Sequence, residues 1–289
     1  MLVDAIRAEG FRLTKNRTAL FWSVVFVPLL SVALGALTSF VLKSGQTKLL
    51  EGAKSPELAE MMSRATLDLA SAMVSAAGGL ANPLVLLFVL IGAATLYAGD
   101  YRWETWRLIS ARNSRPNLIL AKLTVVAVLA LAAMAAMLVG SLVENLIRAG
   151  IFGRGLIFNL SGEQVGQFFA LSGLSWLRIV QFTMVSVLAA VVTRSLLAAL
   201  FVPLVIGVAQ FFTPQMLGPM GVMPDAWLSI LLNPGAAHDA IQATITRAPA
   251  AAALPAGLVL KAWTSLGLWT VVPLAGAVAW FQRQDLSKE

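Results

Sequence analysis

The sequence predicts an all-α integral membrane protein with six transmembrane helices, and two observations carry this prediction. First, 58% of the 289 residues are hydrophobic and only 12% are charged, whereas about a quarter of the residues in a water-soluble domain are charged. Second, six apolar runs approach the ~20 residues that a helix needs to cross a hydrocarbon core about 30 Å thick. In lipid such runs must be helical, because their backbone groups have no water to bond.

The six spans are expected in order along one transmembrane domain that comprises the whole chain, 1–289. The first run follows a basic stretch, but it is too long for the apolar part of a signal peptide, so we expect a retained anchor. Pro28, Pro203 and Pro273 lie inside apolar runs and are expected to kink their helices. The predicted spans are 19–42, 83–98, 117–143, 174–193, 196–212 and 258–281.

An even number of spans places both termini on one side of the membrane, and the distribution of positive charge predicts that this side is the cytoplasm. Of the 21 Lys and Arg residues, twelve crowd the short segments on that side and nine are spread over long loops on the other. The formal net charge of +7 is therefore mostly cytoplasmic, where anionic lipid attracts Lys and Arg by ~1 kcal/mol each. Contact with anionic lipid thus accounts for the positive net charge. Nucleic-acid binding is not needed to explain it, and the sequence has no motif for such binding. The twelve are Arg7, Arg12, Lys15, Arg17, Arg102, Arg107, Arg112, Arg115, Lys122, Arg194, Arg283 and Lys288.

Three extracytoplasmic loops are predicted, at 43–82, 144–173 and 213–257. In the first, Ser55 and Pro56 are expected to open a helix that Gly78 and Gly79 close. Its apolar face would lie on the outer leaflet or on neighbouring spans, and the alternative is a Met-rich surface that contacts a substrate.

The loop 213–257, just before the last span, is apolar yet broken by Pro and Gly. Such a segment could enter the membrane and leave on the same side where protein or water shields its backbone. Short helices at 225–232 and 234–243 are expected within it. The chain's one His, His238, stands next to Asp239, and we expect a hydrogen bond between neighbours rather than a catalytic or metal role.

The chain carries no sequence signature of catalysis or of cofactor binding. It has no Cys, which excludes disulfides and thiolate metal sites, and it has no P-loop, hydrolase or metalloprotease motif. Four charged residues lie within a turn or two of predicted span ends, where they are expected to extend toward water: Lys122, Glu144, Arg178 and Lys261. The spans would then lack the buried acidic relay of an ion-coupled carrier.

The segment 99–116, GDYRWETWRLISARNSRP, interrupts the apolar sequence between the second and third spans. Asp100 is expected to cap a cytoplasmic helix at 100–115. Tyr101 and Leu108 share one side of it and would pack against the spans. Trp103 and Trp106 share the other side and would contact a cytoplasmic partner, since Trp and Arg dominate interfaces. The alternative is that both indoles lie among lipid headgroups.

These residues carry a resemblance to a known family. A basic amphipathic stretch, AIRAEGFRLTKNRTALFW, enters the first span, and ETWRLIS…SR…ILAKL follows from Glu104 to Leu123. Together they resemble type-2 permease subunits of ATP-binding-cassette (ABC) exporters, although the family's Gly before Thr105 is missing. MPDAWLSILLNP, at 223–234, and FQRQDL, at 281–286, are similar to the family's later segments. The chain looks most like the branch of lantibiotic-immunity and bacitracin-type permeases.

The resemblance implies a permease of the bacterial cytoplasmic (inner) membrane, with 1–18 as an interfacial helix and 100–115 as a coupling helix. Its partners would be membrane lipid, a second permease copy or a sibling permease, and separate ABC ATPase subunits that hold ATP and Mg. The chain itself would not be an enzyme and would hold no cofactor. The cargo would be an amphipathic peptide, antibiotic or lipid-like compound, and its contact residues stay unassigned. Carried onto this sequence, the docking residues for the ATPase are Arg102, Trp103, Glu104, Trp106 and Arg107.

Two other classes of function stay open. The chain could be a membrane scaffold or sensor that recruits a cytoplasmic protein without transport. It could also be an intramembrane enzyme, which the lack of polar clusters in the predicted spans disfavours.

Overall fold

The computed structural model describes residues 1–53, 66–102, 105–110, 113–248 and 254–284, and almost all of them are helical. Two short strands, β1 (Leu67–Asp68) and β2 (Leu156–Ile157), pair in parallel. The helices are α1 (Leu2–Lys15), α2 (Arg17–Leu20), the π-helical turn η1 (Phe21–Phe26), α3 (Val27–Ala53), α5 (Leu69–Gly78), α6 (Pro83–Arg102), α7 (Trp106–Ser110), α8 (Arg115–Phe152), α9 (Gly162–Thr193), α10 (Leu196–Leu217), the 3-10 turn η2 (Gly218–Met220), α11 (Trp227–Leu232), α12 (Pro234–Ile245) and α14 (Leu258–Arg283).

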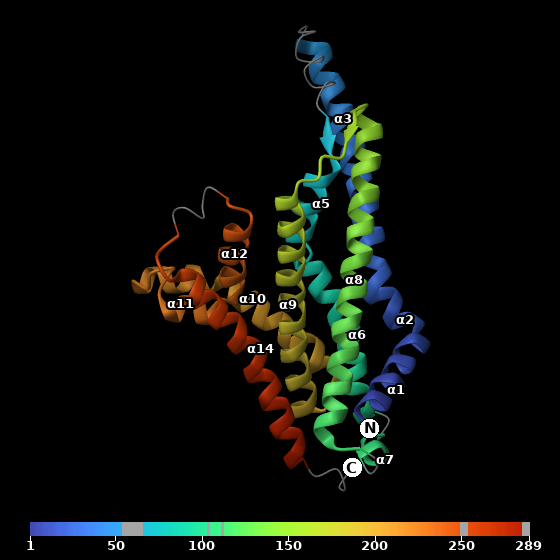
Figure 1. The fold of residues 1–289 in the computed structure, drawn as a ribbon, viewed down its shortest axis with the longest axis vertical. Helices are drawn as coiled ribbons and strands as arrows, with labels where there is room; N and C mark the ends of the chain where they lie inside the picture. The colour runs from blue at the N-terminus through green and yellow to red at the C-terminus, as the bar shows by residue number, and fades with distance from the viewer. Residues whose placement is uncertain (54–65, 103–104, 111–112, 249–253, 285–289) are drawn as a thin grey trace.

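Six helical segments of the described chain are long and apolar enough to cross a membrane, so the prediction of an all-α, multi-pass membrane protein is confirmed. Figure 1 shows the N-terminus and the end of α14 at one end of the molecule, near α7, with the upper part of α3 and α8 at the opposite end. We call the end with the N-terminus the α7 end. The six segments are Arg17–Gly45, Pro83–Tyr101, Arg115–Phe152, Gly162–Thr193, Leu196–Met220 and Leu258–Arg283.

The helices are longer than the predicted spans, so the loops 43–82 and 144–173 are partly helix. Helix α8 has 38 residues, or roughly 57 Å at 1.5 Å per residue. It continues past the polar residues that end its apolar run and stops at Gly153, whose φ of 65° is left-handed. Hydropathy therefore marked the apolar stretch, whereas the helix ends at its capping residue.

The helix that ends at Gly78 is α5, which begins at Leu69. Asp68 caps α5 by accepting a hydrogen bond from the backbone of Ala70 at 3.1 Å, and the helix ends at Gly78 as predicted. Ser55 and Pro56 lie outside the described residues. Helix α5 packs against α9 and α8, in agreement with an apolar face turned toward neighbouring helices.

Two prolines lie where the hydrogen-bond ladder of a helix is rearranged. The π-helical turn η1 ends two residues before Pro28, which has no N–H to donate. Pro203 leaves the carbonyl of Ala199 without its usual donor, and the hydroxyl of Ser186 on α9 donates to this oxygen at 2.7 Å. A neighbouring helix thus supplies the bond that proline removes.

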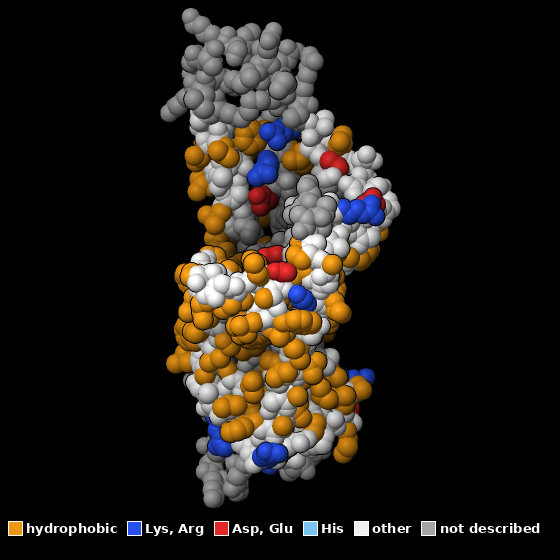
Figure 2. Space-filling view, turned by 90° about the vertical axis from the view of Figure 1, so that its left-hand side faces the viewer, with side chains coloured by type: hydrophobic (Ala, Val, Ile, Leu, Met, Phe, Trp, Pro, Cys, Tyr) orange, Lys and Arg blue, Asp and Glu red, His pale blue; other side chains and the backbone are white. Residues whose placement is uncertain are grey.

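Helix α9 forms the centre of the bundle and packs against α14, α10, α6 and α5. The helices around it turn large apolar side chains outward, and α10 is an example: Phe201, Val205 and Phe211 are more than half exposed. On the face that Figure 2 shows, a broad band of hydrophobic side chains crosses the middle of the molecule. Such a surface suits contact with lipid rather than water.

The segment before the last span contains both short helices that the sequence predicts, α11 and α12. Side chains of α14 bond the carbonyls of this region: Lys261 donates to Asp225 at 2.7 Å, Ser265 to Ile230 at 2.8 Å, and Trp269 to Leu231 at 2.7 Å. His238 lies 3.2 Å from its neighbour Asp239, as expected. These three carbonyls are therefore paired by protein, as the backbone of a re-entrant segment must be.

A cysteine-labelling experiment tests the predicted orientation, since the chain has no Cys of its own. Ser114 is exposed at the α7 end, and Leu160 is half exposed near the opposite end. In intact cells a membrane-impermeant maleimide should label Leu160→Cys and should reach Ser114→Cys only after the membrane is permeabilised. Labelling of Ser114→Cys in intact cells would show that the α7 end lies outside, which contradicts the predicted orientation.

Candidate functional site

The predicted docking helix at 100–115 is divided in the structure. Helix α6 continues through Asp100 to Arg102, and α7 is a separate five-residue helix. The backbone N–H of Thr105 donates to the carbonyl of Asp100 at 3.0 Å, so the chain turns at this point. The prediction of one helix that begins at Asp100 is therefore wrong, because Asp100 lies in the last turn of α6 instead of capping a new helix.

The five predicted docking residues have different positions in the structure. Trp103 and Glu104 lie outside the described residues, and Arg102 and Arg107 belong to α6 and α7 without described side chains. Trp106 is 1% exposed. The expectation that Trp106 faces a partner is corrected, since the chain itself covers this indole.

Trp106 fills the space between α7 and the spans. Its ring centroid lies 4.4 Å from that of Phe281 on α14 and 5.5 Å from that of Tyr101 on α6. The ammonium of Lys122 on α8 lies 5.2 Å from the centre of the indole ring, at a distance where a cation is attracted to an aromatic face. One residue of α7 therefore contacts three spans.

Four charged side chains form an ionic cluster next to Trp106: Glu9, Arg12, Asp100 and Lys122. The ammonium of Lys122 lies 2.6 Å from Asp100 and 2.9 Å from Glu9, and the guanidinium of Arg12 lies 2.8 Å from Asp100. Two cations face two carboxylates, so the cluster is neutral overall. It joins α1 to the end of α6 and the first turns of α8.

The cluster corrects the expectation that Lys122 extends to the surface. Its side chain is 1% exposed, that of Asp100 is fully buried, and Lys122 also donates to the carbonyl of Leu96 at 2.9 Å. A buried ammonium is stable here because carboxylates and a carbonyl replace its water. Burial alone would lower the pKa of Arg12, but the carboxylates of Asp100 and Glu9 outweigh it and raise that pKa above its ordinary value.

Arg115, at the start of α8, binds the end of α14. Its guanidinium donates to the carbonyls of Phe281, Gln282 and Gln284 at 2.9, 3.0 and 2.7 Å, where the last carbonyls of a helix have no partner within it. Gln284 in turn accepts from the hydroxyl of Tyr101 at 2.9 Å and donates to the carbonyl of Val191 at 3.1 Å. Arg115 and Gln284 therefore link α6, α8, α9 and α14 at the α7 end.

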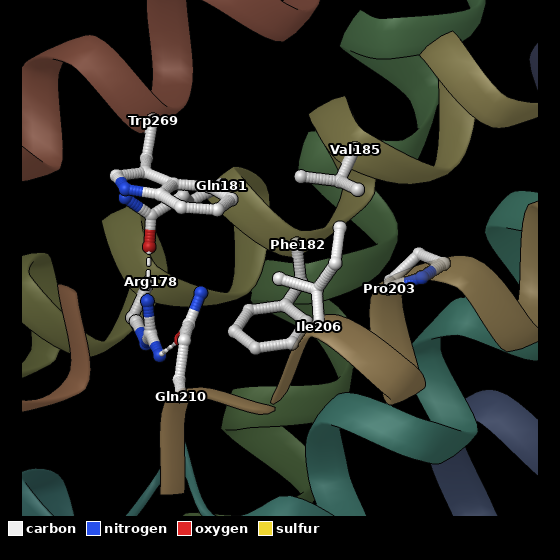
Figure 3. A pocket seen from close by; sticks show the side chains of 8 residues that line it. All are labelled: Arg178, Gln181, Phe182, Val185, Pro203, Ile206, Gln210 and Trp269. Atoms are coloured by element: carbon white, nitrogen blue, oxygen red, sulfur yellow. Dashed lines mark hydrogen bonds between the residues drawn. The ribbon is translucent and has the colours of Figure 1, made fainter. Parts of the chain in front are cut away.

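A second polar group lies deep in the bundle, around Arg178. The guanidinium donates to Gln181 and, at 2.9 Å, to Gln210 on α10, and it lies 4.7 Å from the centre of the Phe182 ring. Figure 3 shows these side chains around a small cavity that Trp269 also lines. Its volume of about 10 Å³ is roughly that of one water.

Arg178 is also a correction, since it is 8% exposed and does not extend to the surface. Helix α9 begins at Gly162, twelve residues before the span that the sequence predicts, so Arg178 lies in its middle. Amide oxygens solvate this charge, and the described residues place no carboxylate within ion-pair distance of it. Sequence reasoning missed the site because Gln210 is 32 residues away along the chain.

Substitution of Lys122 tests the ionic cluster. Lys122→Met leaves two buried carboxylates with Arg12 alone and should lower the free energy of unfolding by about 3–5 kcal/mol. Adding Asp100→Asn should recover part of this loss, because one uncompensated charge is then removed. Thermal unfolding of the purified chain measures both variants. Lys15→Met, at an exposed position, is the control, and an equal loss there would argue against the cluster.

Substitution of Trp106 tests the packing of α7. Trp106→Ala should lower the free energy of unfolding by about 3–5 kcal/mol, because it opens a cavity between three spans, and Trp106→Phe should lose less. The control is Trp280→Ala on α14, where the side chain is 52% exposed. Similar unfolding temperatures for Trp106→Ala and Trp280→Ala would show that Trp106 is not a packing residue.

Comparisons with known proteins add no family assignment. No family model, no curated protein and no solved structure matches this chain.

Proposed function

We propose that this chain is the membrane-spanning permease subunit of an ABC exporter and that the α7 end is where a separate cytoplasmic ATPase subunit docks. The observation that carries the proposal is that a single residue of α7, Trp106, contacts three of the membrane-spanning helices. Trp106 of α7 packs against Tyr101 of α6, Phe281 of α14 and Lys122 of α8. Lys122 in turn is paired with Glu9, which links this group to α1. A partner that moved α7 would therefore move the spans.

The contacts around α7 are suited to transmit a displacement. Close-packed cores move as units rather than deform gradually, and Trp106 is packed against Phe281 and Tyr101 in this way. Buried ion pairs hold their geometry because separating them exposes uncompensated charge. The N-terminal helix moves with the same unit, since Glu9 and Arg12 belong to the cluster.

The burial of Trp106 changes which surface is offered to the partner. Because the Trp106 indole is buried, it does not contact the partner directly. The proposed docking contacts are therefore made by the remaining predicted residues, Arg102, Trp103, Glu104 and Arg107. Trp106 then has a positioning role and transmits the motion of α7 to the spans. The cargo would leave through an interface with a second permease, and ATP and Mg would be held by the ATPase.

Co-purification with a candidate ATPase tests the proposal. We expect the full chain to retain the ATPase encoded beside it and to change its rate of ATP turnover. Trp103→Ala combined with Arg107→Glu should weaken retention by about tenfold or more, as loss of interface anchors does. Arg148→Glu, an exposed residue of α8 far from α7, is the matched control and should leave retention unchanged.

Two results would contradict the permease assignment. If no ATPase is retained by the intact chain, the docking proposal fails. If a cytoplasmic protein is retained but its ATP turnover is the same with and without this chain, the alternative of a non-transporting scaffold is favoured. Lys122→Met separates docking from transmission, since it should keep the ATPase bound and abolish the change in turnover.

A further inference from the structure

A cavity of about 160 Å³ lies between α3, α5 and α8, and we call it the outer cavity. It is far from α7: 22 residues of α8, or roughly 33 Å of helix at 1.5 Å per residue, separate Lys122 from Glu144. Its size is close to that of an engineered cavity of about 150 Å³ that binds benzene. It is lined by Ser31, Ala76, Gly79, Leu80, Met137, Ser141 and Glu144.

Glu144 lines the outer cavity, and no described residue pairs with its charge. The side chain is half-buried, and within the described chain it forms no hydrogen bond and no ion pair. Among the cations on the same pair of helices as Glu144 are Lys43 and Arg148. Lys43 of α3 donates to the carbonyl of Ile151, and Arg148, one turn further along α8, is exposed. An ionisable side chain inside a membrane-spanning helix marks a candidate site for function.

The backbone of α3 makes room for this carboxylate. A Cβ atom at Gly35 would lie 2.6 Å from Cγ of Glu144 and closer still to its carboxyl carbon. Any other residue at position 35 would therefore displace the Glu144 side chain from its present position. Glycine also allows α3 and α8 to approach closely, as small residues do between membrane helices.

The lining of the outer cavity specifies the chemistry of a ligand. Glu144 supplies negative charge, and Ser31 and Ser141 supply hydroxyl oxygens, which together match the three N–H donors of an ammonium group. Leu80, Met137 and Ala76 supply an apolar wall for the rest of the molecule. A bare metal ion would need more oxygen ligands than one carboxylate and two hydroxyls.

We propose that the outer cavity binds the ammonium group of an organic amine, together with an apolar portion about the size of a benzene ring. The amine can belong to the ethanolamine headgroup of a lipid or to a free amphiphile, since both present the same ammonium. The site goes beyond the proposed function and does not rest on it, because it lies on this chain alone and needs no ATPase.

Binding of benzylamine to the purified full chain, in nanodiscs of phosphatidylcholine at pH 7, tests the site. Benzyl alcohol is the neutral probe of similar shape, and both are titrated by ligand-observed NMR. Benzylamine should bind at least about tenfold more tightly, because only the cation pairs with Glu144. Equal affinity for the two probes, or no saturable binding of benzylamine, would overturn the proposal.

Two matched substitutions locate the binding. Glu144→Gln keeps the shape and removes the charge, so it should lower the affinity for benzylamine about tenfold and leave that for benzyl alcohol unchanged. Gly35→Ala should weaken benzylamine binding, because it displaces Glu144. Its control is Gly45→Ala on the same helix, where a Cβ meets nothing within 4 Å. If Glu144→Gln binds benzylamine as the unmodified chain does, the site is not the outer cavity.

The source of the amine is decided by changing the lipid. In nanodiscs of phosphatidylethanolamine the headgroup competes for the site if it is the natural occupant, so the apparent affinity for benzylamine should fall. An unchanged affinity in both lipids assigns the site to a free amine. Both results are measured without an ATPase, so they are independent of the outcome for α7.

Discussion

The buried ion pairs of Lys122 hold the α7 end of the molecule together. A lysine that is 1% exposed inside a membrane protein needs its charge matched, and Asp100 and Glu9 match it from two other helices. Arg12 balances the second negative charge through its ion pair with Asp100. Removing any one of the four charged groups would therefore leave another charge without its partner. These ion pairs therefore fix α1, the end of α6 and the start of α8 relative to one another. Trp106 packs against the same lysine.

Pairing of polar groups inside the bundle also explains several of its irregular parts. The hydroxyl of Ser186 bonds the carbonyl that Pro203 leaves open, and Trp269 of α14 bonds a carbonyl of α11. Arg178 is solvated by Gln181 and Gln210 rather than by water. In lipid these bonds have no substitute, so the side chains that make them select how α9, α10 and α14 pack.

Helix α8 connects the two places where we propose function. Arg115 and Lys122 lie at the α7 end, and Glu144 lines the outer cavity near the other end of the same helix. A continuous helix of 38 residues is stiff enough to carry a displacement along its axis. The amine site and the docking site are thus joined by one element, although each is supported by its own contacts.

The sequence by itself determined the six spans, the two short helices before the last span, and the end of α5 at Gly78, because hydropathy and helix caps depend on residues close together in the chain. Only the tertiary structure decided that Lys122, Arg178 and Trp106 are buried. Their partners are distant in sequence: Glu9 is 113 residues from Lys122, and Phe281 belongs to the last helix. A charged or aromatic residue near a span end has the same local pattern whether it faces water, lipid or a buried partner, and the packing of remote helices selects among these environments.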